Sequence, residues 1–392
     1  MTELTTKNTL VPQKNEGMLL DVGSLMDVLH QIPDPRAARG VRYSLVTLLV
    51  LLILAKLAGQ DGMKGMSEWV QYRGQKLAEL MNLSRQTMPH QTTYERMLAQ
   101  LDELEFERKL GQFFAQQQEE NITINIDGKV LRGTIPAGKT QGTHLLAAYV
   151  PETGVVLMQI EVESKANEIV AAPQLLDYLD LTGCVVTGDA MFTQRELCIQ
   201  IVEAGGHFIL PVKGNQKTVQ HAIADAFMPA QVAKGHQAIG LEETFVESTS
   251  IGHGRIEKRY LTVTSDLNDY LDFPHIQQVF RLQRVIQHQA TGKLSYQVIF
   301  GITSLSREQC APEKLLALVR SHWHIENRLH YVRDVTFHED DCQIRDTKRQ
   351  RLLATLNNLV IGLIRGCDQF DYVPEARRYF DANYDEAFQL IT

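Results

Sequence analysis

The chain has 392 residues, of which 44% are hydrophobic and 22% are charged, values that are ordinary for a globular protein of two or three domains. Its formal charge of −8 excludes nucleic-acid binding driven by overall basicity, so any such contact must come from local basic patches. The five cysteines form no CxxC pair, which excludes a disulfide framework or a zinc site and suits a reducing cytosol.

One apolar run, residues 43–55, resembles a membrane segment at first sight. It holds 13 residues without charge, whereas a bilayer requires about 20. We interpret it as a buried helix. The first residues lack the apolar core of a signal peptide. These features predict a cytoplasmic protein without membrane contact.

The N-terminal third has the sequence pattern of an all-α domain. Residues 1–17 are polar and are expected to be a disordered tail. In residues 18–120 apolar positions recur every three or four residues, with prolines and glycines between the predicted helices. The segment HQTTYERMLAQLD, with Thr93 near its start, is a candidate second helix of a helix-turn-helix-like, DNA-binding unit, although many domains that touch no DNA contain such helices.

At residue 121 the periodicity changes to that of strands. NITINIDGKVLRGT, THLLAAYV and VVLMQIEVESK predict three antiparallel strands, followed by a helix, the strand CVVTG, a second helix and the strand HFILPVK. The order βββ-α-β-α-β predicts a ribonuclease-H-like α/β core formed by residues 121–213 and 307–392. Residues 214–306 predict a β-rich insertion domain, and the chain ends in a helical tail.

Two aspartates follow predicted strands of this core. Asp127 comes after ITINI, and Asp189 comes after CVVTG. Groups at strand ends line the ligand crevice of open α/β sheets, and carboxylates there suit a pair of magnesium ions about 3.5–4 Å apart. The alternatives are a turn-forming Asp-Gly pair for Asp127 and a helix N-cap for Asp189.

A third carboxylate is expected from a predicted helix near residue 326. His322, Glu326, His330 and Arg333 are spaced to form one polar stripe along that helix. A solvated face with ordinary ion pairs is the alternative. Asp334 is the chief rival to Glu326 as the third ligand, ahead of Glu339, Asp340 and Asp341, which lie past the expected helix end.

The motifs IDGKVLRGT, TGDAMFTQ, LPVKGNQ, HGRIEKR and HWHIENRLHYVRDVTFHED occur in this order. Together they resemble the H-repeat-associated transposases, a branch of the DDE insertion-sequence transposases, over most of the chain. The resemblance implies a ribonuclease-H-like catalytic core, a β-rich insertion and Mg²⁺-dependent DNA transposition. It also implies that the family's acidic triad corresponds to Asp127, Asp189 and Glu326.

One departure concerns the signature Tyr-x₂-Arg-x₃-Glu-x₆-Lys of related insertion-sequence enzymes. Val319 stands where the signature has tyrosine, His322 where it has arginine, and Arg333 where it has lysine. Two of these three positions therefore keep a basic side chain, whereas any function of the tyrosine is in doubt.

Basic and amide side chains gather in several places that are candidates for DNA contact, and for each a solvated surface is the alternative. Beside the stripe residues His322, Asn327, His330 and Arg333, the clusters are Lys213, Asn215, Gln216 and Lys217; His253, Arg255, Lys258 and Arg259; Arg36, Arg39 and Arg42; and Arg345, Lys348, Arg349 and Arg351. Phe192 and Trp323 could stack on an unpaired base, although aromatics in such positions more often belong to the core.

The sequence thus predicts a DNA transposase that holds two Mg²⁺ ions, with Mn²⁺ as a substitute, and acts on element termini and target DNA. A homodimer is expected on DNA, because two ends must be brought together, and no small-molecule substrate is expected. Two alternatives remain open at this point: a metal-dependent nuclease that does not rejoin DNA, and a non-catalytic DNA-binding remnant of a decayed element.

Overall fold

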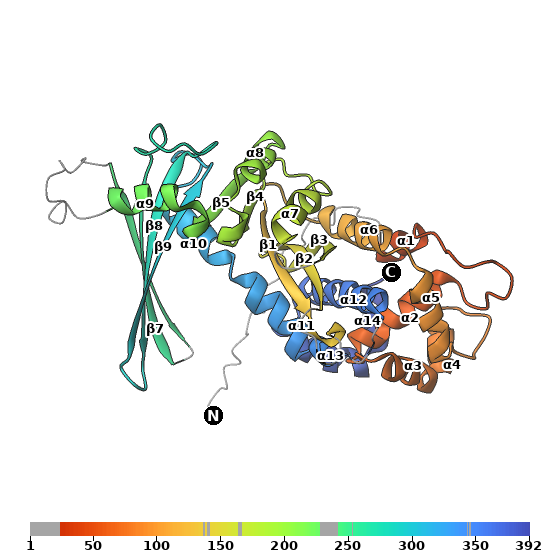
Figure 1. Cartoon of the computed structure of the whole chain (residues 1–392). Helices are drawn as coiled ribbons and strands as arrows, with labels where there is room; N and C mark the ends of the chain where they lie inside the picture. The colour runs from red at the N-terminus through yellow and green to blue at the C-terminus, as the bar shows by residue number, and fades with distance from the viewer. Residues whose placement is uncertain are drawn as a thin grey trace, which may run out of the picture.

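The computed structural model describes residues 24–135, 138, 142–163, 167–227, 242–252, 254–342, 344 and 346–392. The expected tail, residues 1–17, lies outside the described residues, as do His253 and Arg345. Figure 1 shows a body of helices and sheet, from which long strands project to one side.

Among the described residues, helices precede the sheet, as the periodicity predicts: α1 (Leu25–His30), α2 (Leu45–Leu57), α3 (Met63–Tyr72), α4 (Gly74–Leu80), α5 (Gln91–Gln100) and α6 (Glu103–Ala115). The apolar run forms α2, which begins where the Ser44 hydroxyl caps the Thr47 N–H at 3.0 Å. Its side chains are almost entirely buried, so the interpretation as a buried helix is confirmed. No helix in the described part of the chain has the length and apolar character needed to span a bilayer.

The central sheet has the order predicted for a ribonuclease-H-like core. Its strands are β1 (Thr123–Leu131), β2 (Thr143–Val150), β3 (Val155–Val162), β4 (Val185–Gly188) and β5 (His207–Val212), with α7 (Glu168–Leu176) and α8 (Arg195–Glu203) in the two crossovers. The first three strands are antiparallel, and β4 and β5 run parallel to β1 in the spatial order β3-β2-β1-β4-β5. This confirms the predicted fold class.

The β-rich segment continues the same sheet. After α9 (Lys217–Ala226) come β6 (Thr244–Gly252), β7 (Arg255–Thr264), β8 (Gln278–His288) and β9 (Leu294–Thr303), which form an antiparallel array. β9 joins this array to the core, because it pairs with β5 from Ile209↔Thr303 to Val212↔Phe300. The β-rich character of the insertion is confirmed, and its strands are the projecting ones in Figure 1.

The C-terminal helices differ from the continuous helix expected around residue 326. The segment begins as α10 (Pro312–Ser321), changes to the π-helical turn η5 (Ile325–His330) and resumes as α11 (Tyr331–Val335). It is followed by α12 (Thr347–Arg365), α13 (Val373–Ala382) and α14 (Tyr384–Gln389). A π turn holds more residues than the 3.6 of an α turn, so the side chains beyond it point in directions that a straight α-helix does not predict.

A buried polar network holds these layers together around α12. Arg333 donates to Glu339 Oε2 at 2.9 Å and to Gln159 Oε1 at 2.9 Å. The same Glu339 accepts from Asn357 of α12 at 2.9 Å, and Asn357 accepts from Lys56 of α2 at 2.6 Å. Buried charges are tolerated only when they are paired, so this network fixes how α2, α11, α12 and the sheet fit together.

We expect Arg333→Ala to lower the free energy of unfolding by about 3–5 kcal/mol, because Glu339 would remain buried without its cation. Equilibrium urea unfolding measures this loss, with Arg328→Ala as the control, since Arg328 is an exposed arginine of the same segment. A stable Arg333→Ala protein would contradict the structural role of the network.

Candidate active site

The two predicted aspartates lie side by side in the sheet. The parallel register pairs Asn125 with Thr187 and Ile126 with Gly188, so that Asp127 and Asp189 come next at the same level. β4 ends at Gly188, whereas β1 continues beyond Asp127 to Leu131 by pairing with β2. The expectation that Asp127 follows its strand is therefore wrong: it lies within β1, where the pairing with β4 stops.

Asp127 is the more buried of the two, with 19% of its side chain exposed. Its Oδ1 accepts the Gly128 N–H at 2.9 Å, and its Oδ2 lies 3.5 Å from His330 Nδ1. Burial raises the pKa of Asp127 to about 7, and the negative charges of Asp189, Glu168 and Glu326 add to this rise. Three other carboxylates therefore act electrostatically on Asp127.

Asp189 is half exposed, with 56% of its side chain accessible, and a buried chain of hydrogen bonds lies beside it. His322 Nε2 is 4.0 Å from Asp189, and His322 Nδ1 is 3.0 Å from the Thr187 hydroxyl. That hydroxyl donates to Asn125 Oδ1 at 2.8 Å, and Asn125 Nδ2 donates to the Ser321 carbonyl at 2.8 Å. These contacts join β1 and β4 to the end of α10.

Asn125 was not among the predicted site residues. The signal available in the sequence was a polar residue in the middle of ITINI, two positions before Asp127 and hence on the same face of the strand. Lys129 lies two positions after Asp127 on that face, and it was not among the predicted site residues either. Both side chains are buried, and both contact the segment that contains Glu326.

The loop after Asp189 is fixed by residues that follow β5. Asn215 Nδ2 donates to the Ala190 carbonyl at 2.6 Å, and Gln216 Nε2 donates to the Thr193 carbonyl at 3.0 Å. Both side-chain amides thus hold the loop, and their expected contact with DNA stays a prediction. Phe192 in this loop is fully buried, as the core alternative predicted.

Glu326 lies exposed in η5, and no hydrogen bond or ion pair engages its side chain within the described part of the chain. Its rival Asp334, in contrast, accepts from the ammonium group of Lys129. The other rivals are also engaged: Asp340 lies 3.9 Å from Lys129, Asp341 lies 3.8 Å from His338, and Glu339 is buried against Arg333. Of these acids, Glu326 is the one that also raises the pKa of Asp127.

The π turn separates the four residues of the predicted stripe. His322 and His330 are largely buried and face the two aspartates, so they are not the surface groups expected to contact DNA. Burial lowers the pKa of His322, and burial followed by the charge of Arg333 lowers the pKa of His330 to about 3, which keeps both rings neutral at pH 7. Arg333 points the other way into the buried network, so its expected DNA contact is wrong.

The remaining basic clusters divide into exposed and paired residues. Lys213, Lys217, Arg255, Lys258, Arg39, Arg42 and Asn327 are exposed. Others are held by carboxylates or by the backbone: Arg259 by Glu257, Arg36 by Asp34, Arg349 by Asp346 and Glu95, and Arg351 by Glu103 and Glu161. Trp323 lies beneath the Arg284 guanidinium, 5.3 Å from ring centroid to Cζ, and packs against the buried cluster that includes Leu261 and Leu315. The DNA contact expected of the paired arginines stays a prediction.

Within the described residues, no three His, Cys, Asp or Glu side chains are grouped closely enough to hold a metal ion as they stand. The donor set nevertheless suits a divalent ion, because carboxylate oxygens are the ligands that Mg²⁺ prefers. The mutual repulsion that raises the pKa of Asp127 is also what a bound cation would relieve. Asp189 and Glu326 are exposed and therefore free to adjust.

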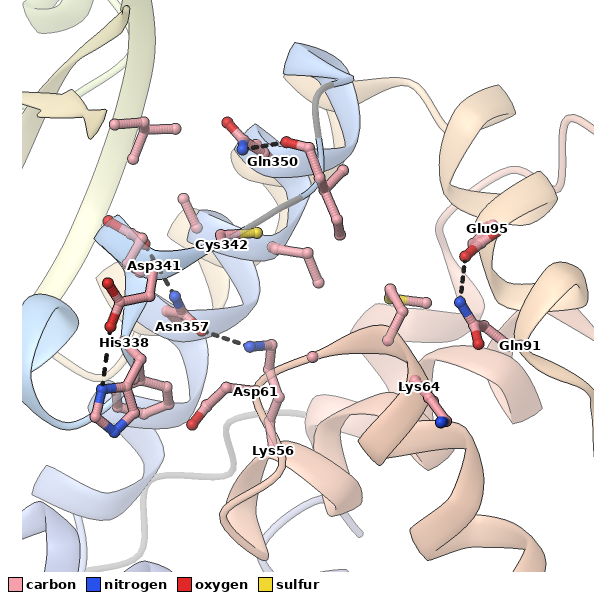
Figure 2. A pocket seen from close by; sticks show the side chains of 18 residues that line it. Lys56, Asp61, Lys64, Gln91, Glu95, His338, Asp341, Cys342, Gln350 and Asn357 are labelled. Carbon is pink, nitrogen blue, oxygen red and sulfur yellow. Dashed lines mark hydrogen bonds and ion pairs between the residues drawn. The ribbon is translucent and has the colours of Figure 1, made fainter. Parts of the chain in front are cut away.

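A cavity of about 430 Å³ lies apart from these carboxylates. Its walls are the connection between α2 and α3, the segment 337–342 and α12. Leu131, the last residue of β1, also lines it. Figure 2 shows Lys56 and Asn357 joined in its wall, with Asp61, His338 and Asp341 nearby. Acidic and basic groups alternate in this lining, and none of the predicted catalytic acids belongs to it.

As the pH rises, we expect the free energy of unfolding of the metal-free native chain to fall relative to that of the Asp127→Asn variant. The folded state holds the Asp127 proton up to about pH 7, whereas the unfolded carboxyl releases it near pH 4, so stability is lost through that window. Urea unfolding with EDTA at pH 5 and pH 8 should show a relative loss of about 2 kcal/mol. The exposed Asp269→Asn is the control, and an equal pH response of both variants would contradict the buried, repelled state of Asp127.

Comparisons with known proteins identify related families and chains. Residues 120–363 match the family model described as Transposase DDE domain, and residues 26–114 match its companion, DDE_Tnp_1-associated. YncI of Escherichia coli O157:H7, named as a transposase, is 30% identical over 354 residues, which cover 89% of each chain. The H repeat-associated protein YhhI of Escherichia coli K12 is 28% identical over 252 residues, covering 62% of this chain and 63% of its own.

Among solved structures, the piggyBac transposase in its synaptic complex with hairpin DNA matches with a TM-score of 0.43 and 11% identity, over 94% of this chain and 77% of that one. The family match covers the whole sheet and the segment that contains Glu326. The chain belongs to the transposases with a DDE domain, and its predicted resemblance to the H-repeat-associated members is confirmed.

Proposed function

We propose that this transposase cleaves DNA at the ends of its element and joins the cut ends to a target, using Asp127, Asp189 and Glu326. The observation that carries the proposal is the level register of the two aspartates on adjacent parallel strands, with the charges of Asp189 and Glu326 both acting on Asp127. Packing gives no reason for three repelling acids at one place in a fold, whereas a cation site does.

Divalent ions are the implied cofactor, since transposase DDE domains generally use them. Asp127, Asp189 and Glu326 would hold two ions, Mg²⁺ or in its place Mn²⁺. When bound, such ions supply the positive charge that activates an attacking oxygen and stabilises a departing one in phosphoryl transfer. Of the three acids, Asp127 is the one whose raised pKa a bound cation would lower again.

The neighbouring histidines and amide group serve to position these acids. His330 stands 3.5 Å from Asp127, and His322 stands 4.0 Å from Asp189. Since both rings are neutral at pH 7, they can orient the carboxylates without forming ion pairs that would compete with a cation. Asn125 ties the strands to the end of α10 and thereby sets the place from which Glu326 approaches.

The DNA would lie over the exposed basic groups near Asp189. Lys213 and Lys217 flank the amides of Asn215 and Gln216, which fix the loop after Asp189, so phosphates bound by these lysines would lie near the acids. Arg255 and Lys258 on the projecting strands, and Asn327 beside Glu326, are further contacts in this proposal. Because transposition joins two ends, the DNA-bound form is proposed to be a homodimer.

We expect Asp189→Asn to reduce Mg²⁺-dependent cleavage of the element's ends at least a thousandfold while DNA binding stays within a few fold of the native value. The amide keeps the shape of the side chain but removes the anionic ligand. Cleavage is followed on labelled terminal fragments, and binding by mobility shift in Ca²⁺. Asp269→Asn serves as the control, and native-like cleavage by Asp189→Asn would exclude this residue from the triad.

Strand transfer separates a transposase from a nuclease that only cuts. The native protein, given pre-cut ends with free 3′-hydroxyls and a supercoiled target, should produce joined products in Mg²⁺. Cleavage of intact ends without any joining of pre-cut ones would favour the nuclease. Failure of both reactions together with retained DNA binding would favour the non-catalytic remnant.

A further inference from the structure

A buried acidic group lies on the opposite face of β1 from the proposed triad. Glu168, the first residue of α7, is 1% exposed, and its Oε1 contacts His144 Nε2 of β2, which is itself 3% exposed. The other oxygen, Oε2, is buried and has no hydrogen-bond partner in the described part of the chain. Burying a carboxylate costs several kcal/mol unless both oxygens are satisfied, so this oxygen requires an explanation.

The Glu168–His144 pair presses against the residue that follows Asp127. A Cβ added to Gly128 would meet Glu168 Cδ at 2.6 Å and His144 Nε2 at 2.5 Å. The N–H of the same Gly128 donates to Asp127 Oδ1. Gly128 therefore lies between the carboxylates of Asp127 and Glu168, and the absence of a side chain at position 128 allows the Glu168–His144 pair to pack against this part of β1.

Electrostatics agree with this proximity. The charge of Glu168 contributes to the raised pKa of Asp127, and His144 contributes to the lowered pKa of His330. The pair is thus within reach of both members of the contact between Asp127 and His330, although it comes from the other side of the sheet.

We propose that Glu168, oriented by His144, is a fourth carboxylate of the metal site, with Oε2, the oxygen that has no partner in the described residues, as the ligand atom. This inference rests on the proposed function, because it needs ions at Asp127. His144 acts as a positioning residue: by engaging Oε1 it leaves Oε2 free. Four carboxylates would bring four negative charges to two divalent ions, which balances their charge.

A purely structural explanation makes a different prediction. As a first-turn residue of α7, Glu168 stabilises the helix by about 0.3–1 kcal/mol through the interaction of its charge with the helix dipole. Glutamine in its place would keep most of the packing and the contact with His144. On that explanation Glu168→Gln leaves metal binding unchanged.

The test is Mn²⁺ binding to the EDTA-treated full chain, measured by calorimetry and by the loss of the free-ion electron paramagnetic resonance signal. We expect Glu168→Gln to weaken the binding of at least one ion tenfold or more, with the melting temperature in EDTA unchanged or higher. Glu196→Gln is the matched control, because Glu196 is an exposed glutamate in the first turn of α8. Native-like Mn²⁺ binding by a folded Glu168→Gln protein would overturn the proposal.

The Asp189→Asn variant, measured in the same way, distinguishes a failure of the proposed metal site from a failure of the fourth carboxylate alone. If Asp189→Asn binds Mn²⁺ normally, the proposed metal site itself fails. If Asp189→Asn loses binding and Glu168→Gln does not, the fourth carboxylate alone fails.

A second measurement needs no variant and therefore covers the case in which Glu168→Gln does not fold. Fe²⁺ with ascorbate and peroxide cuts a polypeptide near the bound ion, and the native chain should be cut near residue 168 as well as near residues 127 and 189. Cuts at the latter two places without any near residue 168 would also overturn the proposal.

Discussion

Repulsion between carboxylates is the interaction on which this structure depends. The sheet brings Asp127 level with Asp189, the π turn presents Glu326, and α7 carries Glu168 to the other side of β1. Their charges combine with burial to raise the pKa of Asp127 to about 7. A fold that holds such groups together is less stable because of their repulsion, and bound cations would restore that stability.

The rest of the molecule holds this arrangement rigid. Asn125 and Thr187 join the two central strands to the end of α10, and the neutral histidines fill the space beside the aspartates. Behind them, the Arg333–Glu339 pair connects α11 to the sheet, to α12 and, through Asn357 and Lys56, to the N-terminal helices. The helical region therefore supports the position of Glu326.

Charge was the least reliable guide to function in the sequence. Arg333, Arg259 and Arg351 look like DNA contacts when only their residue type and neighbours are known, yet each is held by a carboxylate from elsewhere in the chain or in the fold. Asn215 and Gln216 likewise hold a loop through their side-chain amides. The internal partners of such side chains lie up to some 250 residues away along the chain, so residue type and sequence neighbours do not identify them.

Periodicity and strand order determined the layers of this protein, because the alternation of apolar residues depends only on which face of each element is buried. They also pointed to Asp127, Asp189 and Glu326, whose catalytic roles remain predictions. Only the tertiary structure decided the π turn at Glu326, the pairing of Asp334 with Lys129 and the burial of Glu168 beside Gly128. The last two of these features arise from contacts between residues far apart in sequence, which local pattern cannot encode.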